Sequence, residues 1–155
     1  MDTLTATLAE PAAATIPRVL ATDAALALIA TLEAEHGALL FHQSGGCCDG
    51  SSPMCYPRGE FLVGGGDVRV GRLHVDHLAD PVDVWMSKPQ FAYWEHTHLT
   101  IDVVPGRGGG FSLESPEGVR FLLRSRLFTD AEEQALVPVV SGDAVDPAEL
   151  TVPPA

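Results

Sequence analysis

Three cysteines fall within nine residues of the chain, at Cys47, Cys48 and Cys55. Glycines at positions 45, 46 and 50 frame the first two. Because glycine permits backbone conformations that other residues avoid, this loop can turn tightly and bring several sulfur atoms to one point. Thiolates are soft ligands that suit zinc, copper(I) and iron. The loop therefore predicts a transition-metal site that uses all three cysteines.

A fourth ligand has to come from elsewhere, because a closed structural zinc site takes four nitrogen or sulfur donors. The segment EHTH holds His96 and His98, whose side chains point to the same face if these residues begin a strand. We expect His96 to complete the site, with zinc, iron or copper as the bound ion.

Two alternatives stay open for the cysteines. Free cysteines are often buried as small hydrophobic residues, so the three could simply pack the loop. Cys55 could instead pair with Cys47 or Cys48 on oxidation, which would make the loop a redox site. An odd number of cysteines in a reducing compartment disfavours a disulfide framework.

The elements that position this loop follow from the apolar pattern. Thr22 and Asp23 offer a helix N-cap, and Gly37 is a typical C-terminal stop. Between them, apolar residues recur at helical spacing at Ala25, Leu28, Ile29 and Leu32. This pattern predicts an amphipathic helix near the N-terminus.

After Gly37 the chain changes to short apolar runs broken by glycine and proline, which is typical of strands. We expect strands at about 39–43, 61–63, 68–75, 82–87, 99–104, 111–114 and 119–128, then a short helix capped by Thr129. An amphipathic helix packed on a mostly antiparallel, β-rich sheet or sandwich makes an α+β fold. We place one domain at 18–136, with flexible tails at 1–17 and 137–155.

Two further groups of side chains each allow two interpretations. Arg120, Arg124 and Arg126 alternate along the last predicted strand, where they form either a solvated face that pairs with carboxylates or an anion pocket. The aromatic residues either pack the core or line a pocket beside the cysteine loop, at Trp85, Phe91, Tyr93 and Trp94. No GxSxG motif is present and no serine has an evident base and orienting acid, so catalysis is not favoured.

Composition narrows the class of protein. Apolar residues make up 46% of the chain, which predicts a globular domain, and the net charge of −12 disfavours nucleic acid as a partner. No run approaches the ~18 apolar residues of a membrane span, and the N-terminus has no basic start leading into an apolar run. We therefore expect a cytoplasmic protein that does not bind membranes.

Long stretches of the chain resemble a known family. HQSGGCCDGSSPMCYPRGEF, QFAYWEHTHLTIDVVPGRGG and FSLESPEGVRFLLRSRLF together resemble the bacterial domain of unknown function family 779, over about residues 22 to 130. Members of that family are often encoded beside aldehyde dehydrogenases. The resemblance thus implies an accessory role in alcohol or aldehyde oxidation, with an aldehyde dehydrogenase as a possible partner.

A second similarity is to the HesB-like A-type iron–sulfur carriers. Gly45, Gly46 and Cys47 match that family's glycine-glycine-cysteine turn, which implies a HesB-like topology. The family's closing cysteine pair is absent after Ser115, so an iron–sulfur cluster is disfavoured relative to a single ion. If the fold is shared, Cys48, Cys55 and His96 would have to substitute.

These observations predict a small metal-binding accessory protein. An enzyme that acts on an aldehyde through a metal or a thiol is the first alternative, and a non-catalytic regulatory partner of an aldehyde dehydrogenase is the second. A homodimer that brings two cysteine loops together would be a further way to complete the ligand set.

Overall fold

The structure, a computed structural model, describes residues 16–44, 50–76, 78, 80–106 and 112–145. Its helices are α2 (Asp23–His36), α3 (Lys88–Trp94) and α4 (Asp130–Glu133), with short 3₁₀ turns η1 (Ser115–Glu117) and η2 (Gly142–Ala144). Its strands are β2 (Val19–Ala21), β3 (Leu39–Gln43), β4 (Met54–Pro57), β5 (Asp67–Leu73), β6 (Val82–Ser87), β7 (Thr97–Pro105), β8 (Val119–Leu127) and β9 (Val140–Ser141). None of the helices in this part of the chain is long and apolar enough to cross a membrane.

Helix α2 begins and ends at residues with specific capping roles. The Thr22 side chain accepts a hydrogen bond from the Ala25 N–H, which satisfies one of the free donors of the first turn. At the other end Gly37 has φ +83°, a conformation that favours glycine, and its N–H donates to the Glu33 carbonyl. One face of the helix is buried, through Ala25, Ile29 and Leu32.

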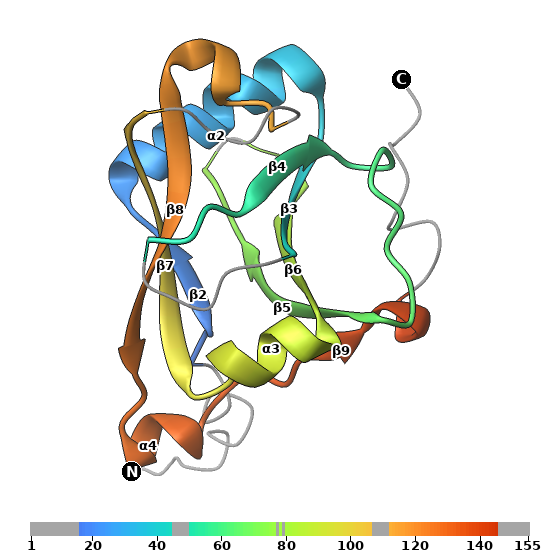
Figure 1. The fold of residues 1–155 in the computed structure, drawn as a ribbon, viewed down its shortest axis with the longest axis vertical. Helices are drawn as coiled ribbons and strands as arrows, with labels where there is room; N and C mark the ends of the chain where they lie inside the picture. The colour runs from blue at the N-terminus through green and yellow to red at the C-terminus, as the bar shows by residue number, and fades with distance from the viewer. Residues whose placement is uncertain (1–15, 45–49, 77, 79, 107–111, 146–155) are drawn as a thin grey trace, which may run out of the picture.

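The strands form two sheets. One has the order β2-β7-β8 and the other β4-β3-β6-β5-β9. Of the six strand pairings in the described residues, four are antiparallel, and β2–β7 and β3–β6 are parallel. Figure 1 shows the two sheets side by side, with α2 across one end and α3 across the other. The predicted α+β class with mostly antiparallel sheets is confirmed.

The main core lies between the two sheets and α2. Phe41 of β3 meets Phe121 of β8 edge to face, with ring centroids 4.9 Å apart, and both are fully buried. Ile29 and Leu32 of α2 and Trp94 of α3 belong to the same cluster. Burying apolar side chains from both sheets in one cluster is what holds β3 and β8 in contact.

A second, smaller cluster lies around Leu40 and Trp85 of the five-stranded sheet. Val145 packs against it from the C-terminal segment, and β9 pairs with β5 at Val68 and Arg69. Residues 137–145, which we predicted as part of a tail, therefore add a strand and a core residue to the domain.

Several predicted elements differ from the structure. β3 and β6 have the expected bounds, but 61–63 and 112–114 are not strands, and β4 lies where we expected only a loop. α3 was also missed. It is capped by Ser87, whose hydroxyl accepts from the Gln90 N–H, and it has a proline in its first turn.

Candidate metal site

Cys55 is a fully buried residue of the edge strand β4. It lies opposite Phe41 of β3, and none of its surface is exposed. Its N–H donates to the Ser112 hydroxyl at 2.8 Å, and its carbonyl accepts from the Leu113 N–H at 3.0 Å. The segment that precedes η1 is therefore fastened to β4 at this position.

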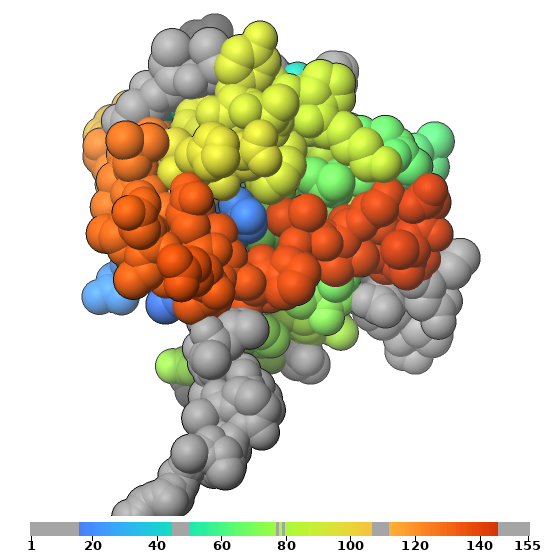
Figure 2. Space-filling view, turned by 90° about the horizontal axis from the view of Figure 1, so that it is seen from below, coloured from blue at the N-terminus to red at the C-terminus, as the bar shows by residue number. Residues whose placement is uncertain are grey.

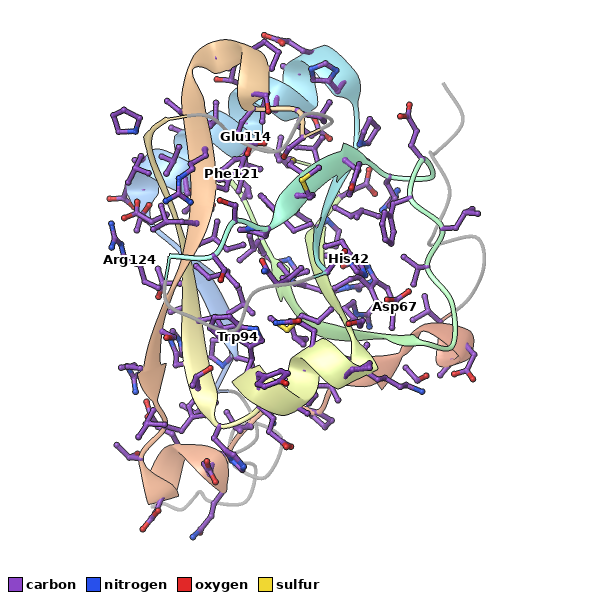
Figure 3. All side chains as sticks on the ribbon, viewed as in Figure 1. His42, Asp67, Trp94, Glu114, Phe121 and Arg124 are labelled. Carbon is purple, nitrogen blue, oxygen red and sulfur yellow. The ribbon has the colours of Figure 1, made fainter. Side chains whose placement is uncertain are left out.

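A fully buried carboxylate, Glu114, lies next to this contact. It accepts a short hydrogen bond from the Ser112 hydroxyl and a second one, at 3.3 Å, from the Phe121 N–H. Both donors are neutral, and within the described residues no cation forms an ion pair with Glu114. Figure 3 shows Glu114 beside Phe121, at the top of the space between the sheets. Burying a carboxylate without a cation costs free energy, so this position needs an explanation.

Burial raises the pKa of the Cys55 thiol well above its usual range, and the negative charge of Glu114 raises it further. A thiol in this setting stays protonated near neutral pH. A cation bound between the Cys55 thiol and the Glu114 carboxylate would lower the pKa of the thiol, because it would favour the thiolate and the carboxylate together.

The residues that follow Cys48 are attached to β8, the strand whose Phe121 N–H donates to Glu114. The Gly50 N–H donates to the Leu123 carbonyl, and the Leu123 N–H donates to the Ser51 carbonyl, both at 2.7 Å. Arg120 donates to the Gly50 carbonyl at 3.0 Å and to the Ser52 hydroxyl at 2.6 Å. This arginine therefore positions the loop end, and neither of our two interpretations of it anticipated that role.

The predicted ligands have different positions. Cys47 and Cys48 lie outside the described residues. His96 follows α3 with its side chain 70% exposed, and its Nδ1 is 3.3 Å from Glu133. The His96 carbonyl accepts from the Phe128 N–H. Phe128 directly follows β8 and is seven residues from Phe121, which corresponds to roughly 20 Å of extended chain. The structure therefore does not bring Cys55 and His96 together.

Residues 28–127 match the family model described as a domain of unknown function, DUF779. The chain belongs to the DUF779 family. No curated protein and no solved structure matches it. The matched region runs from within α2 to the end of β8, so it contains Cys55, Glu114 and the whole cysteine loop. The HesB-like topology and the link to aldehyde dehydrogenases stay predictions.

The DUF779 chain also holds a hydrogen-bonded group that sequence reasoning missed. His42 of β3 is buried, and its Nδ1 is 2.7 Å from the Ser44 hydroxyl while its Nε2 is 2.8 Å from Asp67. Its ring stacks on Phe61 at 4.2 Å between centroids. Asp67 in turn accepts from the Gly64 N–H. Ser44 follows the last residue of β3, two positions after His42, so this pair is close in sequence, but Asp67 comes from β5 and no local signal indicates it.

The contacts of the arginines and the burial of the aromatic residues decide between some of the interpretations left open by the sequence. Arg124 donates to Asp102 at 2.7 Å, and Arg126 binds both oxygens of Glu132 at 2.8 and 2.9 Å, so these two arginines pair with carboxylates on an exposed face. Trp85 and Trp94 are buried in the two clusters, whereas Tyr93 is 68% exposed. Core packing therefore accounts for Trp85 and Trp94.

Within the described residues, no three His, Cys, Asp or Glu side chains gather to hold a metal.

Proposed function

We propose that this DUF779 protein binds a transition-metal ion, zinc, iron or copper, through Cys55, Cys47 and Cys48, with Glu114 as the oxygen donor. The protein acts as a small accessory factor in alcohol or aldehyde oxidation. The chemistry of the donors and the burial of Cys55 and Glu114 support this ligand set. The cellular role is supported by the resemblance of the sequence to proteins encoded beside aldehyde dehydrogenases.

The observation that carries the proposal is the buried pair of Cys55 and Glu114. Each is an acid at 0% exposure, and the described hydrogen bonds to the carboxylate come only from a hydroxyl and an amide. The buried carboxylate costs stability when no cation is present, and a bound cation would stabilise both the carboxylate and the Cys55 thiolate. A thiolate suits a soft or borderline ion, and a carboxylate is a common further ligand for zinc and iron.

Glu114 takes the place that we predicted for His96. Ser112 joins Glu114 to Cys55, since the Ser112 hydroxyl accepts from the Cys55 N–H and donates to the Glu114 carboxylate. The segment that follows Cys47 and Cys48 pairs with β8 through Gly50 and Leu123, two residues along the strand from Phe121. The proposal thus needs no movement of His96 from its exposed position near α4.

Metal analysis of the full chain tests the proposal. The protein is purified without oxygen, and zinc, iron, copper and acid-labile sulfide are measured per chain. We expect close to one metal ion per chain and no sulfide, because the donors suit a single ion. A chain that is metal-free as purified, and that takes up none of the three ions when they are added, would contradict the proposal.

The Ser44–His42–Asp67 group favours a second candidate, an enzyme that acts on a small aldehyde. Asp67 at Nε2 holds the proton on that nitrogen, so Nδ1 is left as the base that faces Ser44, directly before the cysteine loop. In this case His42 would take the proton of a hydroxyl that adds to the aldehyde carbon, and oxidation to the acid would transfer a hydride to an added acceptor such as NAD. With that acceptor present the isolated protein should consume aldehyde, and His42→Gln should abolish turnover while metal content stays unchanged. If the wild-type protein leaves a panel of short aldehydes unchanged, the enzyme candidate is excluded for those substrates.

A further inference from the structure

A pocket of about 410 Å³ lies on the side of the molecule away from Cys55. Cys55 is on the edge strand β4, whereas the pocket borders β5, three strands away in the same sheet, or roughly 14 Å. β9 pairs with β5 only at Val68 and Arg69, and the pocket opens beside the residues that follow, from Val70 to Arg72. Its volume lies within the range of small-molecule sites.

The wall of the pocket combines an apolar surface with basic side chains. Pro17, Val70, Val137, Pro138 and Val140 supply most of the apolar lining. Figure 2 shows this side of the molecule, where the blue N-terminal segment is visible between the orange and red C-terminal segments. A ligand held here would need an apolar body.

The basic residues that line the pocket are Arg18, Arg69, Arg72 and His74. This is a dense group of basic side chains, three of them arginines, for a protein with only 9 lysines and arginines and a net charge of −12. In a chain whose average surface repels anions, such a group indicates a local site for negative charge.

Arg18 is held in place before any ligand binds. Its Nη1 donates to the Glu95 carbonyl at 2.7 Å, and its guanidinium lies 5.2 Å from the Phe91 ring centroid and 5.8 Å from that of Phe128. Its Nε is buried with no hydrogen-bond partner. A preorganised and partly desolvated guanidinium binds a carboxylate more strongly than a mobile, hydrated one.

The charges on all three arginines are already partly compensated. Arg18 interacts with the carboxylates of Glu95 and Glu133. Arg72 donates to Asp83 at 2.8 Å, and Arg69 lies 3.7 Å from the other oxygen of the same carboxylate, which is buried. The pocket therefore presents a modest positive charge next to a larger apolar surface. This combination suits a monoanion with a hydrocarbon portion better than it suits a phosphate dianion.

We propose that this pocket binds a small organic monocarboxylate, with the carboxylate at Arg18 and the hydrocarbon part against Val70, Val137 and Val140. The site is independent of the metal proposal, because it uses none of the same residues and lies at a different edge of the sheet.

Ligand titration of the full chain tests this site. Hexanoate, hexanamide and inorganic phosphate are each titrated and followed by amide chemical shifts. We expect saturable binding of hexanoate. Hexanamide, which has the same shape without the charge, should bind at least about tenfold more weakly. Equal binding of hexanamide would overturn the ionic part of the proposal, and tighter binding of phosphate would overturn the carboxylate assignment.

Val137→Glu and Leu62→Glu form a matched pair of variants. Val137 lines the pocket and is 40% exposed, so a glutamate there places a competing negative charge at the site without burying it. Leu62 is 89% exposed and does not line the pocket. We expect hexanoate affinity to fall at least about tenfold in the first variant and to change less than about twofold in the second. Equal affinities in the two variants would contradict the site, and the amide spectrum of each confirms its folding.

Discussion

Replacing Glu114 with glutamine is expected to weaken metal binding about 100-fold and, at the same time, to stabilise the metal-free protein by about 1–2 kcal/mol. Both effects come from removing one buried negative charge. The carboxylate is fully buried with hydroxyl and amide donors, so without metal its charge is a cost. Glutamine has nearly the same shape, and its carbonyl still accepts from the Phe121 N–H. Zinc competition titrations and urea unfolding of the metal-free protein measure the two effects.

The opposite signs separate a ligand from a residue that only packs the core. Cys55→Ser is the matched comparison, because it also removes a donor at a fully buried position but replaces a thiol by a more polar hydroxyl. We expect Cys55→Ser to lose metal and also to lose stability. If Glu114→Gln binds metal as tightly as the wild-type protein, Glu114 is not a ligand. If Glu114→Gln lowers the free energy of unfolding of the metal-free chain, the buried charge of Glu114 does not destabilise the wild-type protein.

Local signals in the sequence predicted much of the fold correctly. Thr22 and Gly37 mark the two ends of α2 because their roles depend only on neighbours along the chain. β3 and β6 are short apolar runs bounded by residues of other kinds, and their bounds were also correct. Thr129 was recognised as the cap of α4, where it forms a capping box with Glu132.

The missed elements depend on contacts between distant segments. The sequence of β4 looks like a continuation of a glycine- and proline-rich loop, and only its pairing with β3 makes it a strand. β9 is two residues long and exists because it adds to the edge of β5. Short segments of this kind have too few residues to show a period, so tertiary pairing decides their structure.

The candidate site was predictable only in part for the same reason. The cysteines drew attention to the segment that ends at Cys55, and Cys55 lies where the structure gathers buried polar groups. Glu114 looked like a residue of a strand, and nothing local indicates that Ser112 would attach it to Cys55. His96 was expected as a ligand because the segment EHTH places two histidines on one face if they begin a strand. This local pattern gives no distance to Cys55, and the structure places His96 beside Glu133.

The C-terminal segment contacts the loop before β5 more closely than a side chain would allow. At Gly142, an added Cβ would lie 2.1 Å from the Gly64 carbonyl oxygen and 3.0 Å from a Val63 methyl group. The Gly64 carbonyl also accepts from the Asp67 N–H, and Asp67 is the residue that holds His42. Packing of Val145 over Trp85 follows directly after this contact in the chain. Gly142 therefore links the docking of the last segment to the position of a candidate functional side chain.

Gly142→Ala is accordingly expected to lower the free energy of unfolding by about 2–4 kcal/mol, because the clash is with backbone that cannot rotate away. Urea unfolding followed by tryptophan fluorescence measures the change, and loss of the Val145 contact should also make Trp85 emission shift to longer wavelength. Gly66→Ala is the control, since an added Cβ there meets no atom within 4 Å, and it should change stability by less than about 0.5 kcal/mol. Equal stability of the two variants would mean that the C-terminal segment does not dock on Gly64 in solution. Residues other than Val145 would then have to bury Trp85.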